Sequence, residues 1–151
     1  MPLEIRPATP ADASQIAPLL GELGYPSEER EIRARLERFP GHNVIAVVAE
    51  LDGRIVGVAT LAFFASLTFD ADVAWITAFV VSSTLRGSGI GRDMLARLEL
   101  IACERGCERI AVTSAERRDG AHAFYQRLGY AYTGRRFVKQ LNESVQVKHR
   151  I

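Results

Sequence analysis

Hydrophobic residues recur every three or four positions in several segments of the chain, which is the spacing of one face of an α-helix. We expect helices over residues 10–23, 27–39, 89–105 and 119–128. Ser27 is suited to cap the second of these, and the acids Glu28 and Glu29 favour its positive end. The core-facing positions of the first and third are Ile16, Leu19, Leu20, Leu23, Ile90, Met94, Leu98 and Ile101.

Shorter apolar runs predict strands over residues 3–6, 44–50, 54–64, 73–82 and 109–114, with one or two more in residues 130–141. Asp52-Gly53 is a strong signal for a tight hairpin between the second and third strands. Residues 65–72 are expected to form a loop. Because a helix separates the strands at 73–82 and 109–114, we expect them to run parallel through a right-handed crossover.

Length and composition indicate one α/β domain over residues 1–151 with room for a sizeable core. Lys and Arg number 19 against 18 Asp and Glu, so no basic field argues for a nucleic-acid or membrane partner. With no signal-peptide pattern and no long apolar run, the expected location is the cytoplasm. Cys103 and Cys107 are expected to be small buried or half-buried hydrophobes, and the isolated histidines predict no metal site.

The segment after the strand at 73–82 carries the candidate chemistry. It reads Arg86-Gly87-Ser88-Gly89-Ile90-Gly91 and leads directly into a long helix. Glycines let the backbone approach a ligand closely, and unpaired N–H groups at a helix start attract anions. A dinucleotide fingerprint or a P-loop starting at Gly87 fails, because Arg92 and Asp93 stand where a Gly or a Gly-Lys pair is needed. An ordinary strand-to-helix turn is the alternative interpretation.

Three motifs in order resemble the GNAT superfamily of N-acetyltransferases over almost the whole chain. Arg86-x-x-Gly89-x-Gly91 is similar to the family's acyl-CoA signature, with Phe79 and Val81 at the expected places before it. Residues 121–130, AHAFYQRLGY, resemble its late motif, and residues 5–13 resemble its opening strand and helix. The resemblance implies a mixed twisted sheet of six to seven strands flanked by about four helices.

The resemblance also implies a cofactor and site residues. Acetyl-CoA would be the acyl donor, with its pantetheine arm beside the first strand of a splayed parallel pair and its pyrophosphate on the glycine turn. Tyr125 would be the general acid for the departing sulfur, since a phenol is protonated at neutral pH. The expected cofactor-binding residues are Phe79, Val80, Val81, Arg86, Gly87, Ser88, Gly89, Ile90, Gly91 and Ser114.

The general base and the acceptor stay open at this stage. Trp75 and Thr77 stand where many relatives carry a glutamate, and strand alternation would place both on one face with Phe79, lining an acceptor pocket. Glu22, Asp70 and Asp72 are the remaining candidate bases. The expected reaction is transfer of an acetyl group to a primary amine of a small molecule or protein by direct attack. The alternatives are a non-catalytic acyl-CoA-binding module and a generic phosphate-binding domain, and a homodimer is compatible with either function.

Overall fold

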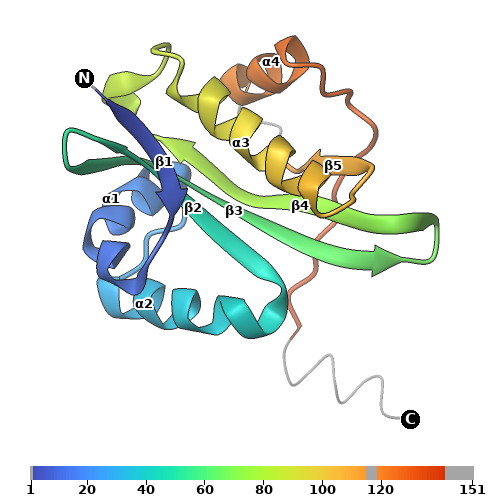
Figure 1. The fold of residues 1–151 in the computed structure, drawn as a ribbon, viewed down its shortest axis with the longest axis horizontal. Coiled ribbons are helices and arrows are strands. Elements are labelled where there is room, and N and C mark those ends of the chain that lie inside the picture. Colours follow the sequence, from blue (N-terminus) through green and yellow to red (C-terminus); the bar gives the residue numbers. More distant parts are fainter. Residues whose placement is uncertain (1, 115–118, 142–151) are drawn as a thin grey trace. The chain divides into compact units, whose positions relative to one another are not determined.

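The computed structural model describes residues 2–114 and 119–141 and divides into two compact parts, Met1–Val112 and Thr113–Ile151. The first part contains a sheet with helices on both faces (Figure 1). Its elements are β1 (Leu3–Pro7), a short 3₁₀ turn (Pro10–Asp12), α1 (Ala13–Leu23), α2 (Glu29–Arg38), a second 3₁₀ turn (Phe39–His42), β2 (Val44–Leu51), β3 (Arg54–Ser66), β4 (Phe69–Val81), a third 3₁₀ turn (Ser83–Leu85), α3 (Ile90–Glu104) and β5 (Arg109–Val112). The second part contains α4 (Asp119–Arg127).

The strands follow one another in the sheet in chain order, β1-β2-β3-β4-β5. Neighbours are antiparallel except β4 and β5, which run parallel with α3 as the crossover between them. The predicted mixed sheet and the predicted parallel pair are therefore confirmed. The tight turn at Asp52-Gly53 is confirmed as well, with both residues at positive φ, 53° and 77°.

The expected number of strands was wrong. The described residues form five strands rather than six to seven, and residues 130–141 contain no strand. Residues 131–141 are exposed throughout. A strand needs a neighbouring ladder to satisfy its backbone and a surface on which to bury one face, and exposed residues lack that surface.

The expected loop at residues 65–72 is also wrong, because β3 and β4 continue through it as one long hairpin. Phe64 pairs with Val73, and Ser66 pairs with Phe69 across a two-residue turn. A hydrogen bond between the Ser66 and Thr68 hydroxyls, which lie 2.9 Å apart, stabilises this turn. The Arg109 guanidinium lies 4.1 Å from the centre of the Phe69 ring, so a cation–π contact with β5 supports the exposed hairpin.

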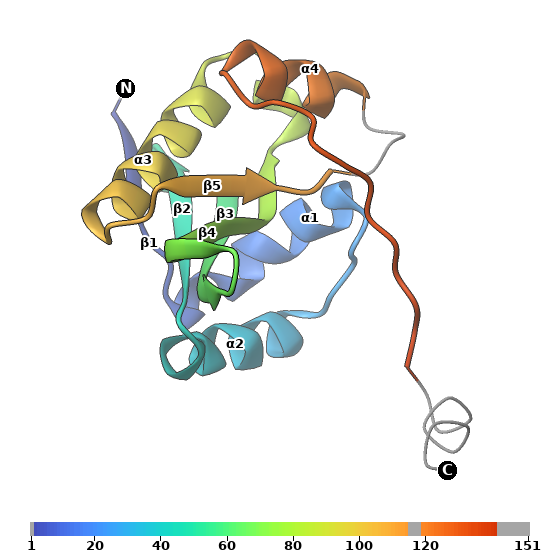
Figure 2. The ribbon, with the colours of Figure 1, turned by 90° about the vertical axis from the view of Figure 1, so that its right-hand side faces the viewer.

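Helices α1 and α2 cover one face of the sheet and α3 covers the other (Figures 1 and 2). On the first face, Ile16 and Leu19 of α1 and Ile32 of α2 pack in one cluster with strand residues that include Val58 and Val80. On the second face, α3 lies so close to β3 that a Cβ built on Gly57 would be 2.6 Å from the Met94 sulfur. Met94, Leu95 and Leu98 of α3 are almost fully buried.

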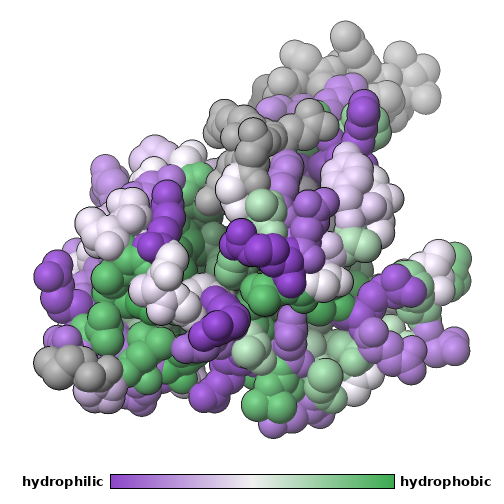
Figure 3. All heavy atoms as spheres, turned by 90° about the horizontal axis from the view of Figure 1, so that it is seen from above, coloured by the Kyte–Doolittle hydropathy of each residue, from purple (hydrophilic) through white to green (hydrophobic). Residues whose placement is uncertain are grey.

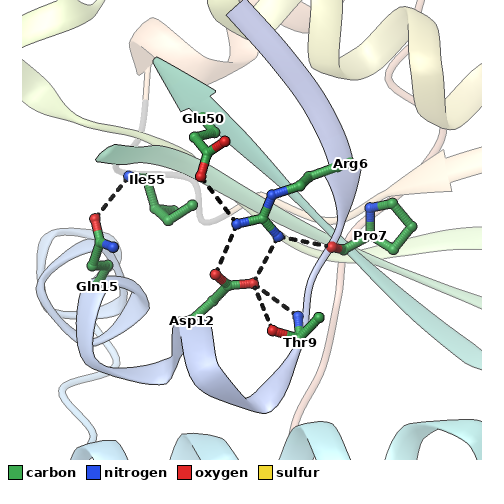
Figure 4. Close-up of polar contacts among 7 residues, drawn as sticks. All are labelled: Arg6, Pro7, Thr9, Asp12, Gln15, Glu50 and Ile55. Carbon is green, nitrogen blue, oxygen red and sulfur yellow. Dashed lines mark hydrogen bonds and ion pairs between the residues drawn. The ribbon is translucent and has the colours of Figure 1, made fainter. Parts of the chain in front are cut away.

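A part-buried ion pair joins β1 to the start of α1 (Figure 4). Both terminal nitrogens of Arg6 donate to the Asp12 carboxylate at 2.9 Å, and Nη2 also donates to Glu50 at 3.3 Å. Asp12 additionally accepts from the Thr9 backbone N–H at 2.8 Å. These hydrogen bonds, the Arg6 contact foremost, hold the pKa of Asp12 below its usual range despite its burial.

The start of α2 differs from expectation by one residue, because Glu28 rather than Ser27 is its cap. Glu28 and Glu31 form a reciprocal capping box in which the Glu28 N–H donates to Glu31 Oε1 at 2.9 Å. The Ser27 hydroxyl instead donates to the Tyr25 carbonyl and accepts from Arg35. Glutamate is not a common cap, so propensity favoured the serine.

The surface mixes hydrophilic and hydrophobic residues on the face seen in Figure 3. Several large apolar side chains of the first part are exposed, among them Tyr25, Phe64, Leu67, Phe69 and Leu100. None of the helices in the described residues has the length and apolar character needed to cross a membrane.

Candidate functional site

The parallel ladder between β4 and β5 is short. It joins Val73–Ile76 of β4 to Arg109–Val112 of β5 and then stops, whereas the ladder between β4 and β3 runs on to Val81. Val80 and Val81 therefore have partners on β3 and none on β5. A strand whose neighbour ends early exposes backbone groups toward the crevice beyond the carboxyl end of the shorter strand, where α/β folds bind ligands.

A β-bulge lies where the two ladders diverge. On β4, Ile76 pairs with Leu61 and Ala78 with Thr60, so Thr77 is the extra residue. The Thr77 hydroxyl lies 2.5 Å from the Thr60 hydroxyl, which closes the bulge on the β3 side. A bulge bends a strand and increases its twist, and this one directly follows Ile76, the last β4 residue that pairs with β5.

The bulge overturns the expected arrangement of Trp75 and Phe79 on one face. Trp75 is opposite Ala62 and Phe79 is opposite Ala59, and these two alanines stand an odd number of residues apart on β3. Trp75 therefore shares the face covered by α1 and α2, and Phe79 shares the face covered by α3. Strict alternation failed because the one-residue insertion at Thr77 reverses the phase.

The glycine turn follows β4 with a fixed backbone. The Ser82 N–H donates to Val56 of β3 at 2.8 Å, and the Leu85 N–H donates to Ser82 at 3.0 Å. Gly87 and Gly89 both have positive φ, 84° and 92°, and Gly89 is the cap residue of α3. These are conformations that glycine adopts without the steric cost other residues incur, which explains two of the three glycines.

The first turn of α3 has backbone N–H groups that the helix does not use. The earliest helical hydrogen bond of the turn runs from Asp93 N–H to Gly89 carbonyl at 3.1 Å, so the N–H groups of Ile90, Gly91 and Arg92 precede the helical ladder. Their orientation and the helix dipole favour a negative group. Arg86 and Arg92 are exposed beside them and add positive charge.

One side chain of helix α1 contacts the segment that leads into the glycine turn. Glu22 Oε1 accepts a hydrogen bond from the Ser83 N–H at 3.1 Å, three residues before Arg86. Hydrogen bonding from Ser83, and to a smaller extent the charge of Arg86, holds the pKa of Glu22 below its usual range. A carboxylate with a lowered pKa is a weak base at neutral pH, which argues against the role of Glu22 as general base.

The structure brings Phe79, Val80, Val81 and residues 86–91 together along one strand and the turn that follows it. Ser114 and Tyr125 belong to the second part. Asp70 and Asp72 lie in β4 near the hairpin turn, before the β5 ladder begins at Val73, and both are exposed. They are therefore at the far end of β4 from the glycine turn.

Within the second part, Ser114 carries a buried hydroxyl with no hydrogen-bond partner among the described residues. The adjoining Ser114 carbonyl lies 3.4 Å from His122 Nε2 of α4. An unsatisfied buried hydroxyl is rare in a folded protein and is consistent with a group that a ligand satisfies. Tyr125 is nearly buried, and its ring contacts Phe124 and Tyr130 at centroid distances of 5.3 and 5.7 Å.

No group of three His, Cys, Asp or Glu side chains converges as a metal site within residues 2–114 and 119–141. Burial, and next the nearby Asp72 charge, raises the pKa of the Cys107 thiol. Cys103 and Cys107 are both free. Cys107 is half-buried as expected, whereas Cys103 is exposed on α3, so its expected burial was wrong.

Known proteins are similar to this chain in fold and in sequence. Relatives include an aminoalkylphosphonate N-acetyltransferase of Salmonella typhimurium, 32% identical over 142 residues that cover 91% of this chain and 91% of that protein. An aminoglycoside N(6')-acetyltransferase type 1 of Stenotrophomonas maltophilia is 30% identical and covers 87% of this chain and 88% of its own. The crystal structure of a Trypanosoma brucei acetyltransferase superposes with a TM-score of 0.80 at 28% identity, over 93% of this chain and 100% of that one.

The relatives support acyl transfer to amines as the activity class. The model of the acetyltransferase (GNAT) family matches residues 14–130, which include β4, the glycine turn, α3 and α4. That stretch is well over half of the chain. The chain therefore belongs to the acetyltransferase (GNAT) family.

Proposed function

We propose that this protein transfers the acetyl group of acetyl-CoA to a primary amine by direct attack in a ternary complex. The observation that carries the proposal is the early end of the β4–β5 ladder at Ile76 and Val112, followed on β4 by a glycine turn at the start of α3. An extended amide chain ending in a pyrophosphate matches a strand edge that leads into an anion site. Acetyl-CoA is such a molecule, whereas ATP has phosphates without the amide arm.

The first part of the chain supplies the binding groups in this proposal. The backbone of residues 79–81 pairs with the pantetheine amides, and the N–H groups of residues 86–91 receive the pyrophosphate. Gly89 suits close approach, because it has no side chain and its φ of 92° is a backbone conformation that other residues adopt only with strain. Arg86 is exposed and complements the phosphate charge.

The second part supplies the remaining groups. The buried Ser114 hydroxyl, which lacks a partner among the described residues, is proposed to contact the cofactor. Tyr125 is proposed to protonate the sulfur when the amine nitrogen has bonded to the carbonyl carbon and the carbon–sulfur bond breaks. A phenol with an ordinary pKa near ~10 stays protonated at neutral pH and matches the basicity of a thiolate leaving group.

Direct transfer is favoured over a covalent acyl-enzyme. A cysteine nucleophile must be a thiolate, and the raised pKa of Cys107 keeps that thiol protonated at neutral pH. Cys107 also follows the C-terminal end of α3, whereas the glycine turn precedes the N-terminal end of that helix. The amine therefore attacks the thioester itself, and its extra proton leaves through solvent or a base that the described residues do not identify.

The acceptor is proposed to be a small amine. Two relatives at 32% and 30% identity are described as acting on an aminoalkylphosphonate and an aminoglycoside. Both names denote primary amines carried on polar small molecules. These two chemical classes are therefore the first acceptors to test, and peptide amino termini are the comparison class.

A panel of amines tests this function directly. The protein is incubated with acetyl-CoA and each of several aminoalkylphosphonates, aminoglycosides, polyamines and short peptides, while free thiol is followed with a colorimetric reagent. The proposal expects thiol release that depends on one class of small amine, with an equal amount of N-acetylated product by mass spectrometry. Binding of acetyl-CoA without transfer to any amine in a broad panel would instead support the non-catalytic module.

A further inference from the structure

The contact between Glu22 and Ser83 joins two segments that are 61 residues apart in sequence. Ser83 begins the 3₁₀ turn that connects β4 to the glycine turn. Ser82, just before it, has φ of −48° and ψ of 134°, and its N–H donates a hydrogen bond to Val56 of β3. The Glu22 carboxylate therefore holds the chain three residues before Arg86.

Helix stability does not explain a glutamate at position 22. The residue lies in the last turn of α1, which ends at Leu23 and is closed by Gly24 in the left-handed conformation. An acid at the negative end of a helix is unfavourable, and α1 has no basic residue in its last turn to offset it. The carboxylate instead has a partner outside its helix, and its charge acts on Arg86.

We propose that Glu22 of helix α1 is a positioning residue that orders the backbone of the phosphate-binding turn. The proposal rests on the proposed acyl-CoA function of that turn. The hydrogen bond to Ser83 orders the backbone that leads to Gly87 and Gly89 before the ligand arrives, and preorganisation of a site raises affinity. The Glu22 charge has the opposite effect, because it is near Arg86 and repels phosphate. Hydrogen bond and charge are therefore separable by substitution.

Two neutral variants isolate the hydrogen bond. Glu22→Gln removes the charge and keeps an acceptor oxygen for the Ser83 N–H, and Glu22→Ala removes both. We expect the alanine variant to bind acetyl-CoA about 2- to 10-fold more weakly than the glutamine variant, the range of one net hydrogen bond. The glutamine variant is expected to bind at least as tightly as the wild type, since it has lost a negative charge.

Ser83 provides the matched second site. Ser83→Pro removes the N–H donor at the first position of a 3₁₀ turn, where proline is tolerated, and the ψ of 134° at Ser82 suits a following proline. Ser83→Ala keeps the N–H and removes the hydroxyl, which also interacts with the Glu22 carboxylate, so it tests the N–H alone. When Ser83 is already proline, the variants with Gln and with Ala at position 22 should bind acetyl-CoA with affinities that agree within about 2-fold. A difference that small means that positions 22 and 83 no longer interact. In the Ser83→Ala background the difference should persist.

The measurements are calorimetric titration with acetyl-CoA and amide hydrogen exchange of Ser83 in the ligand-free protein. The proposal expects a slow Ser83 amide in the wild type and Glu22→Gln, and a faster one in Glu22→Ala. It is overturned if Gln and Ala at position 22 bind acetyl-CoA equally, or if their difference survives Ser83→Pro. Lack of acetyl-CoA binding by the wild type would instead refute the proposed function, and the exchange rates would still report whether the contact forms.

Discussion

The pair Arg6–Asp12 should make a large, pH-dependent contribution to the stability of the first part. Asp12 is 6% exposed and accepts three hydrogen bonds of 2.8–2.9 Å from Arg6 and Thr9. Removing one partner of a buried pair costs about 3–5 kcal/mol, because the other charge is left uncompensated. Arg6 is 25% exposed and keeps its contact with Glu50 at 3.3 Å, so the expected loss for Asp12→Ala is smaller, about 2–3 kcal/mol.

Asp12→Asn separates charge from shape. The amide keeps an oxygen for the Thr9 N–H but loses the charge-assisted bonds to Arg6, for an expected cost of about 1–2 kcal/mol. Glu50→Gln is the matched control, because the longer and more exposed contact predicts a loss below about 1 kcal/mol. Urea denaturation gives these free energies of unfolding, and for a chain of this size Asp12→Ala should lower Tm by about 4–12 °C.

The pH dependence has a definite sign. Arg6 lowers the folded-state pKa of Asp12, so its contribution is fully present above the unfolded value near ~3.9 and is lost as pH falls through the folded value. The difference between the wild type and Asp12→Asn should therefore be constant near neutral pH and shrink in acid. A loss below about 0.5 kcal/mol for Asp12→Ala, the size of an ordinary surface substitution, would refute this account of the pair. An Asn difference that persists unchanged in acid would do the same.

Three further predictions concern the glycines and Tyr125. Gly89→Asp should weaken acetyl-CoA binding at least about 10-fold by placing a bulky acid at the pyrophosphate, whereas Gly41→Asp should not; equal calorimetric affinities in the two variants would contradict the turn assignment. Tyr125→Phe should lower kcat by roughly 10²- to 10⁴-fold with acetyl-CoA affinity nearly unchanged, and a kcat within about twofold of wild type would remove Tyr125 as the acid. Gly57→Ala should destabilise the protein by about 1–3 kcal/mol through overpacking against α3, while Gly21→Ala, which meets no atom within 4 Å, should not; chemical denaturation compares them.

Local signals in the sequence predicted most of the framework correctly. The Asp52-Gly53 hairpin depends on the backbone preferences of two adjacent residues, and the parallel pair follows from one helix between two strands. The glycine turn was identified from spacing, and the positive φ angles at Gly87 and Gly89 give a physical reason for two of its glycines. These features involve neighbours in the chain and so leave a readable pattern.

Features set by contacts between distant segments were missed. The bulge at Thr77 is a property of how β4 pairs with β3, so alternation along β4 alone predicted the wrong face for Trp75. Residues 65–72 form the tip of an extended hairpin, and the exposed ends of its strands need no hydrophobic alternation. The contact of Glu22 with Ser83 was not predicted, although an acid in the last turn of a helix was a signal that its partner lies elsewhere.

The central claim is that the end of β4 and the glycine turn together form an acyl-CoA site rather than a general phosphate site. Competition calorimetry with acetyl-CoA, CoA, 3′,5′-ADP, ATP and NAD tests it most directly, because only the first two carry the pantetheine arm. The account predicts micromolar binding of acetyl-CoA and CoA, on the order of −8 kcal/mol, and much weaker binding of the other three. Competition by ATP or NAD as strong as that of CoA would contradict it.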